Sequence, residues 1–320
     1  MGRYHAEAAA RAGGTVVAVV DPELVRARRL AGDAVAAPSL DALDPRLAID
    51  VIHVCAPLGE HGRLAEQAIA RGTHVIVEKP LTADALSTAA VLKAAKEREA
   101  LVVPVHQFLF QPGVQRLVGA PDRYGSLVRC VFEAATAGAD GSALDRDELV
   151  ADILPHPLAL FSRFTSASLS QIDWLVVRPA PGELRALADV DTTTFEIVIS
   201  TRGRPTRATL DVVGTQASAH ADLYHGFATV EHGSGSGLRK VARPFSLASA
   251  TLGRAGANLT RRALARETAY PGLRELVRRT YDAIATGSPP PISEQETLEV
   301  ARARDALLAR VAAVREEIPK

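Results

Sequence analysis

The chain has 320 residues, of which 47% are hydrophobic, and it carries 37 acidic and 37 basic side chains. This length allows a large buried core and favours two domains over one. A formal net charge of zero excludes the long-range attraction to nucleic acid or to an anionic membrane surface that a strongly basic protein exerts. We therefore expect a small molecule as the ligand.

Cysteine usage and hydropathy predict a cytoplasmic protein. Cys55 and Cys130 are too few for a disulfide framework and form no CxxC pair, which favours a reducing compartment. The N-terminal residues lack the apolar core of a signal peptide. No apolar run approaches the roughly 20 residues needed to span a bilayer.

Residues 1–106 show strands alternating with helices. Apolar, β-branched runs lie at residues 15–20, 51–56, 74–77 and 101–105, with helical stretches at 60–71 and 83–99. Such runs are typical of strands buried on both faces of a parallel sheet. The alternation predicts βαβ units in a Rossmann-like, doubly wound α/β domain.

The pattern changes over residues 107–320, which we interpret as a second, α+β domain. Residues 193–200 and 206–213 alternate as half-buried antiparallel strands do, and helices are expected at 270–286 and 293–314. The C-terminal helix could pack back on the first domain. The segment His232–Gly237 favours a hairpin tip over a phosphate cradle, because no strand-to-helix switch is expected around it.

The first residues resemble the middle of a dinucleotide-binding motif. Gly2, an Ala-rich helix over 6–12 and a strand ending at Asp21 match the second half of a nucleotide-binding βαβ unit. The strand and the two glycines that should precede them would lie centrally in the sheet, between residues 15–20 and 51–56. We expect one of two situations. Either the protein starts about ten residues upstream, or the two strand edges pair directly or accept another segment between them, with weaker NAD binding.

Two polar residues follow predicted strands where a cofactor could bind. Asp21, nineteen positions after Gly2, fits the acidic residue that binds the adenosine ribose and disfavours NADP, although an Asp-Pro pair is also a common helix cap. His61 follows Ala56-Pro57 at a helix start, where a phosphate or ribose hydroxyl is favoured. Local packing of His61 is the alternative.

Two further sites could transfer protons. Lys79, beside Glu78 and just past a buried strand, could share a proton with a substrate hydroxyl while Glu78 binds the cofactor, although both could be solvated turn residues. Asp152 and His156 can share a helix face, so that the carboxylate orients a histidine that relays a proton. No further cluster completes a metal site around them.

Together these motifs resemble the Gfo/Idh/MocA family of NAD(P)-dependent oxidoreductases. The resemblance covers nearly the whole chain, in the right order. The elements that carry it are Gly2-Arg-Tyr-His5, Val20-Asp21, Ala56-Pro57 with His61, Glu78-Lys79-Pro80, Asp152 with His156, and residues 291–297.

The resemblance implies a Rossmann domain that binds NAD and an α+β domain with a large, mainly antiparallel open sheet. That sheet would cover a sugar-like substrate and mediate a homo-dimer or tetramer. Lys79 would be the catalytic lysine, His156 the acid/base at the reacting hydroxyl, and Asp152 its neighbour or a substrate ligand. The implied cofactor contacts are Gly2, Arg3, Asp21, Ala56, Pro57, His61, Glu78 and Gln107.

Two other hypotheses stay open at the level of sequence. A family member that has lost cofactor binding would act as a binding or partner subunit, and a family enzyme can use NAD for lyase or hydrolase chemistry through transient oxidation. The stretch His106–Phe110 carries few charges, which favours a less polar substrate.

Overall fold

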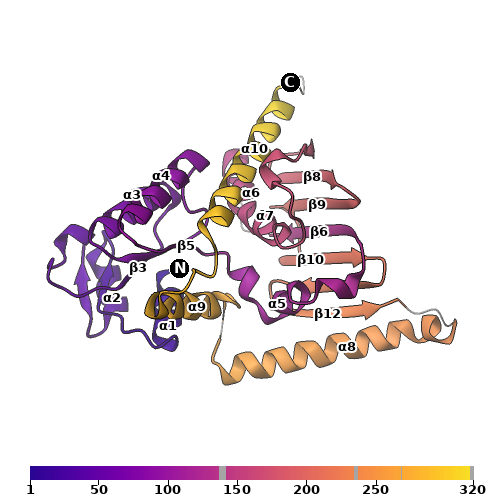
Figure 1. The fold of residues 1–320 in the computed structure, drawn as a ribbon, viewed down its shortest axis with the longest axis horizontal. Helices are drawn as coiled ribbons and strands as arrows, with labels where there is room; N and C mark the ends of the chain where they lie inside the picture. Colours follow the sequence, from indigo (N-terminus) through magenta and orange to yellow (C-terminus); the bar gives the residue numbers. More distant parts are fainter. Residues whose placement is uncertain (137–141, 234–236, 268, 318–320) are drawn as a thin grey trace. The chain divides into compact units, whose positions relative to one another are not determined.

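The computed structural model (Figure 1) describes residues 1–136, 142–233, 237–267 and 269–317. By its contacts the chain divides into two compact units. Unit 1 comprises Met1–Val105 and Leu273–Ala301, and unit 2 comprises His106–Gly272 and Arg302–Lys320. The first boundary lies beside residue 106, where the sequence pattern changes. Residues 273–301, which the sequence assigned to the second domain, lie in unit 1.

Unit 1 contains parallel strands, as expected of a Rossmann-type domain. They are β1 (Ala18–Val20), β2 (Val35–Ala37), β3 (Val51–Val54), β4 (His74–Val77) and β5 (Val102–Pro104). β1 pairs with β2, and β3, β4 and β5 form a second sheet in that order. Within unit 1, all of whose residues are described, β1 and β3 are not hydrogen-bonded to each other and no other strand lies between them in the sheet.

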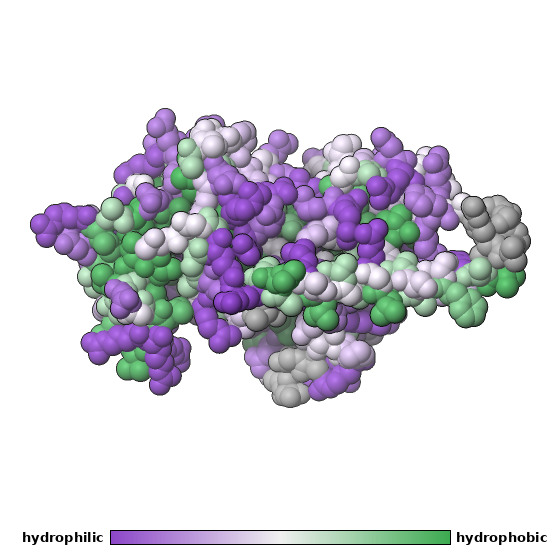
Figure 2. Space-filling view, turned by 90° about the horizontal axis from the view of Figure 1, so that it is seen from below, coloured by the Kyte–Doolittle hydropathy of each residue, from purple (hydrophilic) through white to green (hydrophobic). Residues whose placement is uncertain are grey.

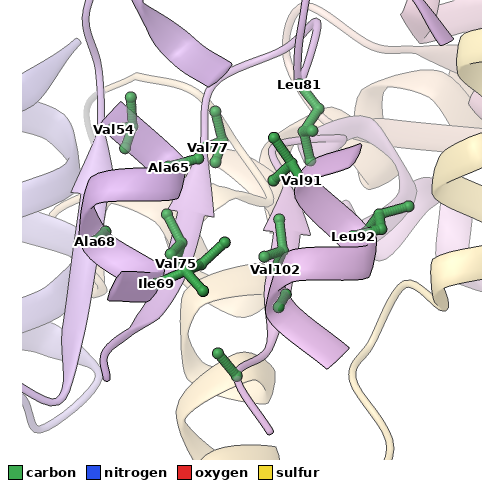
Figure 3. Close-up of a cluster of buried hydrophobic side chains, with 12 residues drawn as sticks. Val54, Ala65, Ala68, Ile69, Val75, Val77, Leu81, Val91, Leu92 and Val102 are labelled. Atoms are coloured by element: carbon green, nitrogen blue, oxygen red, sulfur yellow. The ribbon is translucent and has the colours of Figure 1, made fainter. Parts of the chain in front are cut away.

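Helices and a shared apolar core complete unit 1. The helices are α1 (Gly2–Arg11), α2 (Leu24–Ala31), α3 (Leu58–Ala70), α4 (Ala85–Glu97), α9 (Leu273–Thr286) and the start of α10 (Glu294–Glu317). The 3-10 helix η1 spans Leu40–Ala42. Figure 3 shows the core between strands and helices, where Val75 and Val77 of β4 face Ile69 of α3 and Val91 of α4. The burial of β4 on both faces explains its unbroken run of apolar residues.

Unit 2 is built on a large, mainly antiparallel sheet, which confirms the fold expected for this half. Its strands are β6 (Leu127–Ala135), β7 (Leu175–Val177), β8 (Glu183–Val190), β9 (Thr193–Ser200), β10 (Arg207–Gly214), β11 (Ala217–Asp222) and β12 (Phe227–His232). The order in the sheet is β12-β11-β10-β6-β9-β8-β7. β6 and β9 run parallel, and the other neighbouring pairs are antiparallel.

One face of this sheet is buried and the other is partly open. Phe195, Ile197 and Ile199 of β9 are buried, whereas the residues between them are half-buried. Such alternation is typical of an antiparallel sheet with one packed face. The helices of this unit include α5 (Pro112–Val118), α6 (Ala143–Ile153) and α7 (Pro155–Phe161), with 3-10 helices η2 (Gln107–Phe110), η3 (Pro121–Tyr124) and η4 (Leu169–Gln171).

The segment between β12 and the next element differs from the expected hairpin tip. β12 ends at His232 and the long helix α8 (Gly237–Leu264) follows, so this segment joins a strand to a helix and the hairpin prediction was wrong. Residues 234–236 lie outside the described residues. Among the helices that the structure describes, α8 included, none has the length and apolarity required to cross a bilayer.

Candidate active site

The loops that follow β3 and β4 in unit 1 are tied together by His61. Its Nδ1 lies 2.8 Å from the carbonyl oxygen of Pro80, and its Nε2 lies 2.7 Å from the carbonyl oxygen of Ala56. Carbonyl oxygens only accept hydrogen bonds, so both bonds form when both ring nitrogens carry hydrogen. The histidine is buried, with 2% of its surface exposed. Both ring nitrogens thus face backbone, which makes His61 a brace between two loops.

The Glu78 carboxylate is held by a buried histidine from α1. His5 Nε2 lies 2.9 Å from Glu78 Oε1, and the backbone N–H of Lys79 donates to Oε2 over 3.3 Å. Burial raises the pKa of Glu78, but the hydrogen bond from His5, with the charges of His5 and Lys79, outweighs burial and sets the pKa below its usual value. Glu78 is therefore an ionised, fixed acceptor at neutral pH.

The hydrogen bonds continue from His5 to two residues for which the sequence suggested no role. His5 Nδ1 lies 2.9 Å from His53 Nδ1, and His53 Nε2 lies 2.9 Å from the Tyr281 hydroxyl. Burial, and then the charge of His5, lower the pKa of His53 to about 3, and burial raises the pKa of Tyr281 to about 12. We call Glu78, His5, His53 and Tyr281 the buried relay.

The protons of the buried relay can be arranged so that every contact is a hydrogen bond. Tyr281 is a phenol and His53 is a neutral ring, so two arrangements satisfy the contacts. Either the Tyr281 O–H donates to His53 Nε2 and His53 Nδ1–H donates to His5 Nδ1, or His5 Nδ1–H donates to His53 Nδ1 and His53 Nε2–H donates to the Tyr281 oxygen. In both arrangements His5 Nε2–H donates to Glu78 Oε1. Every polar atom along this path has a partner, which fixes the loop that carries Glu78.

A histidine within an apolar strand was the sequence signal for this relay. His53 lies inside β3, between Ile52 and Val54, where a polar ring is costly unless it is hydrogen-bonded. Its partners are far apart in sequence, since Tyr281 lies 228 positions later. A single sequence could therefore indicate the buried histidine but not its contacts.

Lys79 is half-buried and directly follows β4, as the sequence predicted. Its bond to Pro80 is cis. Cys55, at the end of β3, is not a nucleophile at neutral pH, because burial and the charge of Glu78 raise its pKa to about 12. Lys79 and Glu78 therefore remain the titratable residues that the sequence predicted to act at this edge of unit 1.

Three residues predicted to bind the cofactor lie at other points of unit 1. Gly2 begins α1. Arg3 is exposed and lies over its neighbour Tyr4, with the guanidinium carbon 4.8 Å from the ring centroid. Asp21 follows β1, and its Oδ1 accepts the backbone N–H of Glu23 over 2.8 Å. This last bond is a local turn contact and not the helix cap that the sequence left as the alternative for Asp21, because the N-cap of α2 is Glu23.

The remaining predicted residues belong to unit 2. Asp152 is half-buried in the last turn of α6, whereas His156 is buried at the second position of α7. The two helices meet at Leu154, where Pro155 and Pro157 begin a new helix. The pair therefore spans two helices instead of sharing one face. The His156 ring packs on Phe108, with centroids 4.4 Å apart.

Gln107 is a buried residue in η2 whose side-chain oxygen lacks a hydrogen-bond donor among the described residues. Within the described residues, its Oε1 is shielded from solvent and accepts no hydrogen bond. A buried acceptor without a donor costs about 1–3 kcal/mol. This oxygen suits a ligand that offers an N–H or O–H group, as the carboxamide of nicotinamide does.

Comparison with known proteins supports the family resemblance over the first third of the chain. Residues 1–106 match the model of the Gfo/Idh/MocA oxidoreductases, described as an oxidoreductase family with an NAD-binding Rossmann fold. Over 173 residues, covering 52% of this chain, the sequence is 31% identical to UDP-N-acetylglucosamine 3-dehydrogenase from Acidithiobacillus ferrooxidans. Residues 1–106 therefore match the Gfo/Idh/MocA family.

Other relatives of this chain have similar names. A dTDP-3,4-didehydro-2,6-dideoxy-alpha-D-glucose 3-reductase from Streptomyces violaceoruber is 35% identical over 95 residues, which cover 30% of this chain and 28% of that enzyme. The chain spans about half the length of the Acidithiobacillus relative, with 52% of it aligned.

Solved structures show the same fold over nearly the whole chain. The structure of the Acidithiobacillus ferrooxidans enzyme has a TM-score of 0.74 at 21% identity, covering 97% of this chain and 93% of that one. A levoglucosan dehydrogenase in complex with NADH and levoglucosan has a TM-score of 0.77 at 16% identity, covering 98% and 95%. Both comparisons show that the chain has the same fold as these two enzymes.

Proposed function

We propose that this protein is an NAD-dependent oxidoreductase that transfers a hydride between nicotinamide and a secondary alcohol or ketone carbon of a sugar-like molecule. One observation carries the proposal. Lys79 is half-buried directly after β4, beside a Glu78 carboxylate that the buried relay holds in place. Carboxyl ends of parallel strands are where doubly wound folds bind their ligands.

The proton transfers that accompany hydride transfer are assigned to three residues. We propose Lys79 as the group that exchanges a proton with the reacting hydroxyl, because a lysine on a fixed loop can donate a proton to that oxygen as the ammonium and accept one from it as the neutral amine. His156 would act at the same hydroxyl, and Asp152 would orient it or bind substrate. The bound nicotinamide would supply or accept the hydride, and the protein would position the reactants.

Several side chains are suited to hold NAD. The buried Gln107 Oε1, which has no donor among the described residues, would accept from the nicotinamide carboxamide. Asp21 would accept from the adenosine ribose hydroxyls and disfavour a 2′-phosphate. Among solved structures of the same fold, one is a complex with NAD and another a complex with NADP. The Asp21 carboxylate is our reason for preferring NAD.

His61 has a different proposed role from the one its sequence position suggested. Because both ring nitrogens face the carbonyl oxygens of Ala56 and Pro80, it would position the loops and not contact a phosphate itself. Ala56, Pro57, Gly2 and Arg3 would contact the cofactor through the loop after β3 and the start of α1. Backbone N–H groups at helix starts favour anionic ligands.

The names of the relatives support a sugar-like substrate. Two of them denote a dehydrogenase and a reductase that act at position 3 of a nucleotide-linked sugar, and levoglucosan dehydrogenase acts on an anhydrosugar. We extend this to the substrate class, a polyhydroxylated ring with one secondary alcohol or ketone as the reacting group. We also propose a cytoplasmic homo-oligomer that binds neither nucleic acid nor membrane.

The proposal is tested by cofactor binding followed by turnover. We expect NADH to bind more tightly than NADPH in calorimetry and to be oxidised with keto-sugars from a substrate panel. Lys79→Met should lower kcat by about 10²–10⁴-fold while keeping NADH affinity. Lys93→Met is the matched control, because that lysine lies 79% exposed on α4. If neither dinucleotide binds, the oxidoreductase proposal fails and a binding or partner subunit becomes the better interpretation.

A further inference from the structure

We propose that α8 forms an antiparallel helix pair with α8 of a second copy of this chain. The contact surface is the α8 stripe, which we define as Val241, Phe245, Ala248, Leu252, Ala255 and Leu259. Its large members are strongly exposed: Val241 by 75%, Phe245 by 77%, Leu252 by 76% and Leu259 by 69%. Contiguous apolar surface of this kind marks an interaction site.

The body of unit 2 holds α8 by a different side. Asn258 Nδ2 and Arg262 Nη1 both donate to the carbonyl oxygen of His225, over 2.9 and 3.1 Å. α8 also contacts β12, beside which it runs in Figure 1. Figure 2 looks onto this side and shows hydrophobic surface along the helix. The stripe is therefore exposed except at Ala255, which is half-buried.

The spacing of the stripe fits a helix as the partner. Its residues follow one another at intervals of 4, 3, 4, 3 and 4 positions. This is the heptad spacing of about 3.5 residues that keeps one seam facing a second helix in a coiled coil. In heptad notation Phe245, Leu252 and Leu259 take one core position, and Val241, Ala248 and Ala255 take the other.

The stripe is complementary to itself when the second helix runs antiparallel. A twofold axis that crosses the stripe at the level of residue 250 along the helix places Phe245 opposite the partner's Ala255 and Leu252 opposite the partner's Ala248. The same axis places Val241 opposite the partner's Leu259. Each layer thus joins the two kinds of core position, and the two layers nearest the axis join a large side chain to an alanine. Isologous contacts of this type close a dimer.

The charges on α8 favour a second helix over a membrane surface. The helix has no acidic residue, and with about 3.6 residues per turn Arg243, Arg254 and Arg261 lie on the side opposite the stripe. Arg243 pairs with Glu231 at 2.7 Å and Arg261 with Glu267 at 3.2 Å. A membrane-binding helix uses basic residues of its polar face to attract anionic lipid, whereas here two of these three are already paired with carboxylates.

The size of the stripe sets the strength of the expected contact. Four large exposed side chains on each copy bury roughly 1,000 Å² in total, the lower end for specific interfaces. We therefore expect a reversible association that depends on protein concentration. No residue of the stripe belongs to the large sheet or to the proposed active site, so the inference does not rest on the proposed function.

The first experiment measures mass in solution. Sedimentation velocity over a range of concentrations should show that Leu252→Glu halves the number of copies per particle, or weakens the association at least tenfold, relative to the unaltered chain. The matched control is Ala250→Glu, which adds the same charge on the exposed opposite side of α8. Equal masses for the unaltered chain and for Leu252→Glu, with both folded by circular dichroism, would overturn the proposal.

The second experiment tests the orientation and the other possible occupant. A short bismaleimide should link Phe245→Cys to Ala255→Cys in a mixture of the two variants, and should link neither variant to itself. Self-linking of either variant would contradict the antiparallel pair. Vesicles of phosphatidylglycerol should not sediment the protein; binding that Leu252→Glu abolishes, without a change in mass, would assign the stripe to a membrane and overturn the proposal.

Discussion

His5 donates a hydrogen bond to Glu78 over 2.9 Å, which joins α1 to the loop after β4 across 73 positions of sequence. The two residues belong to two different family motifs, one at the start of the chain and one around Lys79. The hydrogen bond makes these motifs one physical unit. His53 and Tyr281 extend this unit to α9, so residues late in the sequence also support the Glu78–Lys79 loop.

Loss of His5 should destabilise unit 1 through Glu78. His5→Ala leaves an ionised, buried carboxylate without its main donor, which should lower the free energy of unfolding by about 1–3 kcal/mol. The control is Arg63→Ala, which breaks the exposed Arg63–Glu60 pair and should cost less than about 1 kcal/mol. Urea unfolding measures both. If both variants lose a similar amount of unfolding free energy, the His5–Glu78 hydrogen bond stabilises the protein no more than an exposed ion pair does.

His53 should make stability depend on pH between about 3 and 6.5. Its folded pKa of about 3 lies below the ordinary value of 6.5, so in this window the unfolded chain binds a proton that the folded chain does not. Stability must then fall as pH falls, by about 1.4 kcal/mol per pH unit for one proton.

The measurement compares the unaltered chain with His53→Gln, which keeps polar atoms but does not titrate. Urea unfolding at several pH values between about 7 and 5 gives the slope of stability against pH for each. We expect the slope of the unfolding free energy against pH to be smaller in His53→Gln, by an amount that corresponds to nearly one bound proton. Identical slopes would mean that His53 is not neutral in the folded protein.

The sequence was most informative where burial dictates composition. The run His74–Val77 matches β4 exactly, because a strand covered on both faces must be apolar throughout. Of the apolar run 15–20, residues Ala18–Val20 form the strand β1, because these three residues pair with the three residues of β2. The end of β4 also located Lys79 and Glu78, since ligands bind at carboxyl ends of parallel strands.

The sequence was least informative where contacts join distant residues or where local propensity is weak. Nothing local indicates that His5, His53 and Tyr281 form one chain of hydrogen bonds. Helix α8 was not predicted, because Pro244, Gly253 and Gly256 disfavour helix within it. Its heptad spacing becomes informative only once the backbone is known to be helical.

Asp21 should control the choice between NAD and NADP. Asp21→Ser removes the carboxylate that would accept the ribose hydroxyls and repel a 2′-phosphate. We expect NADH affinity to fall by about tenfold, as for the loss of one or two hydrogen bonds to a charged group, and NADPH affinity to rise. Calorimetry with both cofactors measures this. If the ratio of NADH affinity to NADPH affinity is unchanged, the Asp21 side chain has only a local role, as the acceptor of the hydrogen bond from the Glu23 backbone N–H.

Gly272 should prove essential for the backbone around Gln107. Its φ is +95°, and an added Cβ would lie 2.1 Å from the Gln107 carbonyl oxygen, so Gly272→Ala must move η2. We expect a loss of more than about 2 kcal/mol in unfolding free energy and weaker NADH binding, because Gln107 would lose its place. Gly253→Ala is the control, since its added Cβ has no atom within 4 Å apart from its neighbours and the adjacent backbone of α8. That change should stabilise the chain by about 0.5–1 kcal/mol. If Gly272→Ala unfolds at the same urea concentration as the unaltered chain, the contact between residues 272 and 107 is not rigid.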